Sequence, residues 1–149
     1  MPIDNPGEVG ASTKEFFSSV TYTTANIRQW GDFPTAFLIA LNNAAWISFH
    51  VPHDFTAIVE AVIIVIPDRT TADADWDIYS DYGASGEAYN THSEQDVATL
   101  YNVTANQLFE VDISGILSAL AADDYVGIQL KLADALDAVN VVGVRFKYN

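Results

Sequence analysis

The order of apolar and polar side chains along this chain predicts β-strands over most of its length. Apolar residues occupy every second position in segment 108–113 and again in segment 142–148. This period of two is typical of a strand with one buried face, because successive side chains point to opposite sides of a sheet. Segment 45–51 alternates in the same way. We expect its core face to hold Ile47, Phe49 and Val51, and its other face to hold Trp46, Ser48 and His50.

Two longer segments differ in the composition of their faces. Segment 57–66 is apolar on both faces apart from Glu60, so we expect a central strand that is covered on both sides. Segment 74–82 alternates, and Trp76 and Ile78 are predicted to face the core. The opposite face of this acidic strand is predicted to carry Asp73, Asp75, Asp77, Tyr79 and Asp81.

Shorter strand candidates are residues 16–23, 87–91, 97–103 and 123–128, the last beginning with a turn. Segment 35–41 fits either a short strand or a helical turn, and the polar segment 92–96 is predicted to be a connection. One helical segment, 114–120, follows the N-cap candidates Asp112 and Ser114. We expect it to close an open end of the fold with Ile116, Leu117 and Leu120.

The chain has 149 residues, half of them hydrophobic, which is enough for one full core. We therefore predict an all-β protein, a single jelly-roll-like antiparallel β-sandwich of about eight strands with one short helical turn. Residues 1–10 contain two prolines and two glycines and are predicted to form an extended N-terminal arm, with the sandwich domain at 11–149. The predicted core residues are Ile47, Phe49, Val51, Val62, Ile64, Trp76, Ile78, Val111, Ile113, Val126, Ile128, Val142, Val144 and Phe146.

The charge of the chain excludes two classes of partner. Twenty acidic and six basic residues give a formal net charge of −14. A surface this acidic repels phosphate backbones and anionic headgroups, so we expect neither nucleic-acid nor membrane binding. The longest apolar run, 61–66, is far shorter than the roughly 20 residues that span a bilayer, and the N-terminus does not have the pattern of a signal peptide. Cysteine is absent, which excludes disulfides and thiolate chemistry.

Two groups of residues are candidate metal ligands. The aspartates from Asp73 to Asp81 have the alternation of a calcium loop, but Ile78 stands where such a loop needs glycine and Ala84 where it needs glutamate. The solvent-exposed face of a strand is the simpler interpretation, and calcium binding is left open. The histidines are His50, His53 and His92, and Pro52 excludes a helical pair at the first two. Surface histidines are therefore favoured over a zinc site.

No catalytic constellation is present. The nucleophile elbow of serine hydrolases does not occur, and Ser85 lies in a Gly-rich loop without an evident base. Glu60 and Glu110 are the carboxylates that a glycoside hydrolase could use, although nothing in the sequence joins them. We assign no catalytic, cofactor-binding or metal-binding residue. A sugar-stacking platform is a further hypothesis, against the alternative of core packing, for the aromatic residues Trp30, Trp46, Trp76, Tyr79, Tyr82, Tyr89 and Tyr101.

Several short motifs carry a resemblance that extends over most of the chain. They lie at Val51–Phe55, Trp76–Tyr79, Tyr82–Tyr89, Glu110–Ser114, Asp124–Ile128 and Gly143–Tyr148. Together they resemble a group of uncharacterised environmental proteins, some of them phage-derived. More loosely, the pattern is similar to jelly-roll virion shell and decoration proteins and to carbohydrate-binding modules. This resemblance implies a fold but no activity, and no functional residue is carried over from it.

We predict from these observations a non-enzymatic structural protein that assembles with copies of itself. A capsid, decoration or surface protein of a phage virion fits the lack of catalytic motifs, the high apolar fraction and the N-terminal arm. Its partners would be copies of itself and a major capsid or other shell protein, at the surface of the particle. The alternative is an extracellular carbohydrate-binding module with a glycan as ligand, and a small hydrolase using Glu or His ranks third.

Overall fold

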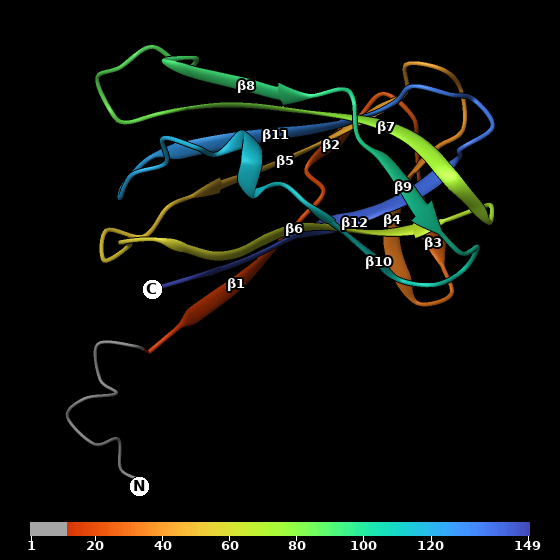
Figure 1. Cartoon of the computed structure of the whole chain (residues 1–149), viewed down its shortest axis with the longest axis horizontal. Coiled ribbons are helices and arrows are strands. Elements are labelled where there is room, and N and C mark those ends of the chain that lie inside the picture. Colours follow the sequence, from red (N-terminus) through yellow and green to blue (C-terminus); the bar gives the residue numbers. More distant parts are fainter. Residues whose placement is uncertain (1–11) are drawn as a thin grey trace, which may run out of the picture.

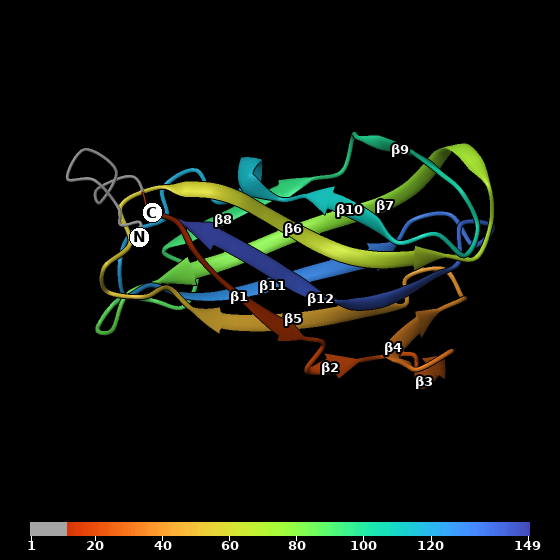
Figure 2. The same ribbon diagram turned by 90° about the horizontal axis from the view of Figure 1, so that it is seen from below.

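The alternating segments pair into two antiparallel sheets that face each other, as Figures 1 and 2 show for residues 12–149 of a computed structural model. Apolar side chains from both sheets fill the space between them. The first sheet has the order β10 (Phe109–Asp112), β6 (Ile58–Pro67), β12 (Val139–Tyr148), β4 (Phe33–Leu38) and β3 (Asn26–Trp30), with β1 (Lys14–Ser19) also beside β12. The second has the order β2 (Tyr22–Thr23), β5 (Ala44–His50), β11 (Tyr125–Leu132), β7 (Thr71–Gly83) and β8 (His92–Asp96), with β9 (Leu100–Val103) also beside β7. The predicted all-β, jelly-roll-like sandwich is confirmed, and the predicted arm, residues 1–10, lies outside the described residues.

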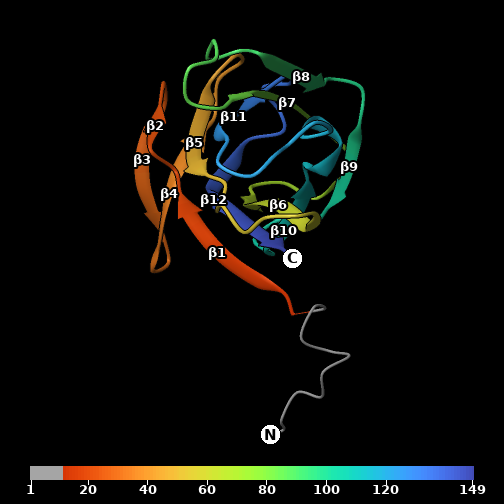
Figure 3. The same ribbon diagram turned by 90° about the vertical axis from the view of Figure 1, so that its left-hand side faces the viewer.

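Residues 12–149 form twelve strands rather than about eight, partly because one predicted strand divides between the sheets. Segment 16–23 contributes β1 to the first sheet, where it pairs with β12, and β2 to the second, where it pairs with β5. Figure 3 shows the chain passing between the layers at this edge of the sandwich. Segment 35–41, for which the sequence fitted either a short strand or a helical turn, lies mostly in strand β4.

The core agrees with the predicted residues except on two strands. The predicted residues found in the central apolar cluster are Ile47, Val51, Trp76, Ile78, Val111, Ile113, Val126, Ile128, Val144 and Phe146, and Phe49 packs against it half-buried. On β6 the predicted Val62 and Ile64 face outward, whereas the cluster uses Ala61, Ile63 and Val65. Because both faces of β6 are apolar, the alternation could not show which face is the inner one.

A β-bulge explains the second difference, on β12. The pairing of β12 with β6 shifts between Val141 and Gly143, so one extra residue is inserted into the strand. Val139 and Val141 face the core before the shift and Val144 faces it afterwards, which leaves Val142 outside the central cluster. A strict period of two therefore assigns Val142 to the wrong face.

The connection between β7 and β8 also differs from the sequence prediction. Segment 87–91, predicted as a strand, is part of two consecutive turns, closed by hydrogen bonds from the Glu87 N–H to the Ala84 carbonyl (3.0 Å) and from the Thr91 N–H to the Ala88 carbonyl (3.1 Å). Segment 92–96, predicted as a connection, is strand β8. Its polar composition fits its place at the edge of the second sheet.

The predicted helical segment is a single 3-10 turn, η1 (Ser114–Ile116), after β10. Ile116 and Leu117 are buried in the core, and Leu120 packs against it, as predicted for a plug at an open end. The Asp112 carboxylate accepts hydrogen bonds from the Ser114 N–H (2.9 Å) and hydroxyl (2.8 Å), which fixes the start of the turn. Between residues 12 and 149, no helix has the length and apolar character needed to cross a membrane.

Candidate functional site

The outer face of the second sheet gathers aromatic and polar side chains into one open surface. On β5, β11 and β7 the buried positions alternate with exposed or half-buried ones, so every second residue points away from the core. The strand register aligns these outward residues in rows that run across the sheet. We call this surface the outer face, and it is the candidate site.

The first row contains three aromatic rings and two amides. Its members, in order across five strands, are Tyr22, Trp46, Gln129, Tyr79 and Gln95. The rings of Tyr22 and Trp46 lie 5.3 Å apart, and Tyr22 is 61% exposed. Trp46 and Tyr79 stand two strands apart, which corresponds to about 10 Å at the usual spacing of strands. The ammonium of Lys131 lies 5.2 Å from the centre of the Tyr79 ring.

The second row is polar and has a gap at its centre. It consists of Ser48, Gly127, Asp81 and Ser93. Because Gly127 has no side chain, the surface is hollowed there, and a pocket of about 100 Å³ opens between this row and the first. The pocket is lined by Trp46, Tyr79, Asp81 and Gln129, among others.

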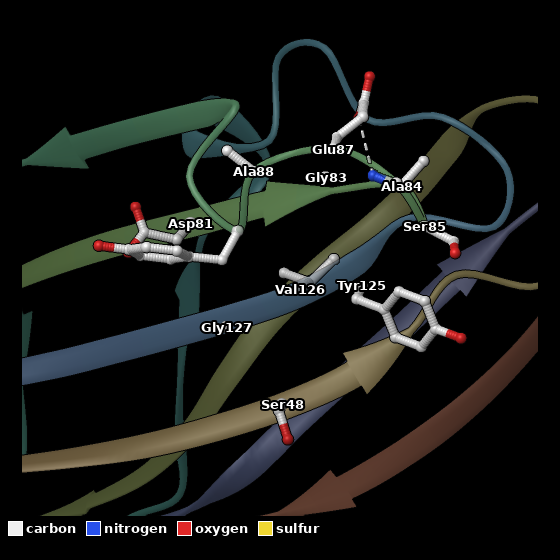
Figure 4. A pocket seen from close by; sticks show the side chains of 12 residues that line it. Ser48, Asp81, Gly83, Ala84, Ser85, Glu87, Ala88, Tyr125, Val126 and Gly127 are labelled. Carbon is white, nitrogen blue, oxygen red and sulfur yellow. Dashed lines mark hydrogen bonds between the residues drawn. The ribbon is translucent and has the colours of Figure 1, made fainter.

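A larger pocket of about 510 Å³ continues from the second row toward the turns between β7 and β8. Figure 4 shows Ser48 and Gly127 on adjacent strands, with Tyr125 at the start of β11 and the turns carrying Ala84 and Glu87 along the rim. Tyr125 and Tyr89 border this pocket and are 60% and 78% exposed. Both pockets are lined by Asp81 and Gly127, so they adjoin at these residues, and we call the two together the groove.

Close backbone packing holds the rim of the larger pocket. The Glu87 carboxylate accepts a hydrogen bond of 2.8 Å from the Ala84 N–H, drawn as the dashed line in Figure 4. A Cβ atom on Gly83 would lie only 2.9 Å from the Ala88 carbonyl oxygen. Glycine at this position therefore lets the turns fold back onto the end of β7.

Acidic side chains line and flank the groove: Asp81 and Glu87 are in its lining, and Asp77 lies on the same face of β7. Burial and the neighbouring charge of Asp75 raise the pKa of the Asp77 carboxyl above its usual range, while Lys131 acts in the opposite direction. Asp81 is half-buried, and within 12–149 its carboxylate takes part in no ion pair or side-chain hydrogen bond. Both of its oxygens are therefore free to accept hydrogen bonds from a ligand in the groove.

The aromatic residues considered for a sugar platform divide into three groups. Trp76, Tyr82 and Tyr101 are buried in the core, where the Trp76 and Tyr101 rings stack 5.5 Å apart. Trp30 lies on β3 of the first sheet, beside the guanidinium of Arg28. The remaining members, which belong to the candidate site, are Trp46, Tyr79 and Tyr89.

Sequence reasoning missed Tyr22, Tyr125 and Gly127 as site residues. The alternation of segment 45–51 showed that Trp46 points outward, and the same reasoning on β11 would have placed Tyr125 and Gly127 on one face. Nothing in a single sequence shows that these strands are neighbours, so the rows could not be assembled from it.

The structure separates the candidate metal ligands. His50 lies beside the Tyr125 ring (4.7 Å), with Nε2 3.6 Å from Asp123 Oδ1, His53 follows in the next turn, and His92 stacks on Tyr82 (4.8 Å). The aspartates of β7 point outward in a line, as predicted. In the part of the chain that the structure describes, no three His, Asp or Glu residues are grouped so that they could hold a metal ion.

The candidate catalytic carboxylates meet, but around a cation. Glu60 and Glu110 lie on neighbouring strands β6 and β10, and each pairs with the guanidinium of Arg145, at 2.7 Å and 2.8 Å. Glu15 adds a third contact at 3.5 Å, and the hydrogen bonds that the guanidinium donates to Glu60 and Glu110 raise the pKa of Arg145. The cluster is an ion-pair network rather than an acid–base pair across a cleft. Ser85 borders the larger pocket, whose lining contains no histidine.

Comparison with known proteins gives similar folds only. No family model and no curated protein matches the chain. Among solved structures, it is similar to the xylan-binding module CBM86 of Roseburia intestinalis (14% identity, TM-score 0.46, covering 93% of this chain and 96% of that one). It is also similar to the CBM36-1 domain of a xylanase from the hindgut metagenome of Trinervitermes trinervoides (9%, TM-score 0.47, 89% and 96%) and to CBM36 in complex with calcium and xylotriose (13%, TM-score 0.45, 89% and 98%).

These comparisons correct the functional prediction. The assignment as a capsid, decoration or surface protein of a virion is wrong, because the similar solved structures described are carbohydrate-binding modules. The expected capsid or other shell partner is not supported by these matches. The apolar fraction that suggested buried subunit contacts is accounted for in large part by the core between the two sheets. The resemblance to environmental proteins was not tested by any match and stays a prediction.

Proposed function

We propose that this protein binds a neutral polysaccharide in the groove on the outer face of its second sheet, without transforming it. The observation that carries the proposal is the row with Tyr22, Trp46 and Tyr79, which lies beside a hollow at Gly127. An open surface with aligned rings fits an extended ligand better than a small, enclosed one.

The chemistry of the groove matches that of a sugar ring. Pyranose rings have apolar C–H faces, and flat aromatic side chains bury such faces while their polar edges stay in contact with water. Ser48, Asp81 and Gln129 lie between the rings and offer hydrogen-bonding groups to sugar hydroxyls. An apolar lining with a few converging polar groups is the usual composition of a binding site.

The charge of the groove indicates the class of polysaccharide. Asp77, Asp81 and Glu87 stand on or beside the face, in a chain with a formal net charge of −14. Like charges would repel a polymer rich in uronate or sulfate. A neutral polymer avoids this repulsion, and such ligands are found outside cells, which agrees with the extracellular alternative.

Binding without catalysis is the simplest role for this groove. Glu60 and Glu110, the carboxylates considered for hydrolysis, lie on the first sheet and are paired with Arg145. A binding module needs neither a second copy nor a shell partner, so we expect a monomer to bind its ligand. The predicted homo-oligomer has no part in this proposal.

The proposal is tested by affinity electrophoresis and tryptophan fluorescence with xylan, galactomannan and mixed-linkage β-glucan. Wild-type protein should be retarded by at least one of these polymers and should shift its fluorescence. Trp46→Ala should weaken binding about tenfold or more, since central aromatic contacts commonly contribute about 2 kcal/mol and 1.4 kcal/mol is tenfold.

Trp30→Ala is the matched control, because Trp30 is also half-buried but lies on β3 of the first sheet. It should bind like the wild type. Equal losses in both variants, or a wild-type protein that binds no neutral polysaccharide, would contradict the proposal.

A further inference from the structure

Gly127 occupies the centre of the outer face. It lies on β11, the middle strand in the order of the second sheet, and pairs with Ser48 on one side and Asp81 on the other. Along its own strand the next outward residues are Tyr125 and Gln129. The space above Gly127, where another residue would carry a side chain, is thus surrounded by polar and aromatic groups on all sides.

The fold itself does not require glycine at position 127. A Cβ atom built there would meet only the Asp81 carbonyl oxygen, at 3.9 Å, which is an ordinary contact. The contrast is with Gly143, where a Cβ would lie 2.4 Å from the Ser18 carbonyl oxygen and could not be accommodated. Glycine inside a strand is destabilising relative to alanine. Glycine at position 127 therefore leaves room for a ligand in the groove, and it is not needed for packing inside the protein.

Asp81 is the hydrogen-bonding group next to this space. It lines both pockets, and its carboxylate has no partner among the described side chains. A carboxylate has two acceptor oxygens, and hydrogen bonds to an ionised acceptor are stronger than those between neutral groups. Two hydroxyls on adjacent ring carbons present two donors at a spacing that fits one carboxylate.

We propose that Gly127 is the floor of a central sugar subsite and that Asp81 binds two adjacent free hydroxyls of the sugar seated there. The rings of Trp46 and Tyr79 border this subsite on one side, and Tyr125 borders it on the other. The inference rests on the proposed function and deepens it, because it selects neutral polysaccharides whose sugars carry a free vicinal diol.

The first test fills the subsite from within. Gly127→Val adds a side chain that favours strands and points into the groove. Its unfolding midpoint in urea should equal or exceed that of the wild type, while its affinity for the polysaccharide that the wild type binds should fall at least tenfold. Gly127→Ala, which adds a single methyl group, should give a smaller loss and keeps the test valid if the valine variant does not fold.

The second test addresses the diol. Xylan, galactomannan and β-glucan are each compared with their O-methylated forms, which lack free hydroxyl pairs. Wild-type protein should prefer the unmethylated polymer by about tenfold or more, and Asp81→Ala should reduce this preference to less than about threefold. Trp46→Ala should weaken binding while the preference for free hydroxyls remains.

The outcomes distinguish the two proposals. If Gly127→Val and Gly127→Ala bind like the wild type while Trp46→Ala does not, the subsite is wrong and polysaccharide binding stands. If Asp81→Ala keeps the preference for free hydroxyls, the role of Asp81 is wrong. Binding of the cationic polymer chitosan in place of neutral ones, lost in Asp81→Ala, would contradict both proposals, because the carboxylate would then bind an ammonium group. A wild-type protein that binds none of these polymers contradicts the proposed function itself.

Discussion

Asn140 shows how a single polar residue is accommodated in an apolar strand. Its side chain is fully buried on β12, between valines at 139 and 141. The amide nitrogen donates to the Ile66 carbonyl (3.1 Å), and the amide oxygen accepts from Arg28 Nε (3.2 Å) and the Thr35 hydroxyl (3.4 Å). These bonds join β12, β6, β4 and β3, so one amide connects four strands of the first sheet.

Asn140→Leu should lower the free energy of unfolding by about 1–3 kcal/mol. Leucine has a similar shape to asparagine, but it leaves the Ile66 carbonyl, the Thr35 hydroxyl and Arg28 Nε without the bonds that the amide makes. Urea denaturation measures the change. Asn102→Leu, at an exposed position of β9, is the matched control and should stay within about 0.5 kcal/mol. An Asn140 variant as stable as this control would show that the amide network contributes nothing.

Asp77 is a residue whose charge opposes folding. Burial, followed by the charge of Asp75, raises its pKa, so protonation of Asp77 favours the folded state. This contribution is fully present below the unfolded pKa of about 3.9 and is lost as the pH rises through the higher folded value. Asp77→Asn should therefore raise the melting temperature at pH 7 and leave it nearly unchanged at pH 3. A variant destabilised at pH 7 would show that the contact with Lys131 outweighs burial.

At the scale of elements, the turns between β7 and β8 depend on close backbone contacts. Two hydrogen-bonded turns and the Glu87 carboxylate hold this segment against Gly83. The segment borders the larger pocket with Tyr89 and Glu87, so its position affects the groove. A small displacement of the turns would alter the site without disturbing the core.

Gly83→Ala should destabilise the fold by about 1–3 kcal/mol, because its Cβ would lie 2.9 Å from the backbone oxygen of Ala88. It should also weaken polysaccharide binding by moving the rim of the groove. Gly115→Ala is the control, since a Cβ there meets nothing within 4 Å. The melting temperatures of the two variants are measured by thermal unfolding. Equal melting temperatures would show that the turns accommodate the added methyl group without loss of stability.

At the scale of the whole molecule, the net charge of −14 acts against the compact fold. Asp75, Asp77 and Asp81 stand on one face of β7, at about 7 Å between successive outward positions. Their repulsion is screened by salt, with a Debye length of about 8 Å at 0.15 M ionic strength. The acidic face therefore makes stability dependent on the ionic strength of the solution.

We expect the melting temperature to rise as sodium chloride is increased from low ionic strength to about 0.15 M. Calcium should do no more than magnesium at equal ionic strength, because the described residues contain no group of carboxylates arranged for a metal ion. Calorimetry with each salt measures this. A rise of several degrees produced by micromolar calcium alone would establish a metal site on the acidic strand.

The sequence determined most of the strand segments, but not those between residues 87 and 96, and it determined which residues of most strands face the core. Segment 45–51 and the acidic strand were oriented correctly, because each has one apolar and one polar face. Orientation failed at Val62 and Ile64, where both faces are apolar, and at Val142, where a bulge shifts the phase. Local pattern carries this information only where the two faces differ and the strand is regular.

Only the tertiary structure decided which strands are neighbours, and therefore what the site is. Trp46, Gly127 and Asp81 lie on three strands from distant parts of the chain, and pairing in register brings them together around one groove. Cross-strand pairing depends on the packing of two whole sheets around a common core, so no local pattern encodes it. The sequence by itself therefore determined the fold class and the outward direction of Trp46 and the aspartates, and the structure decided that they form one surface.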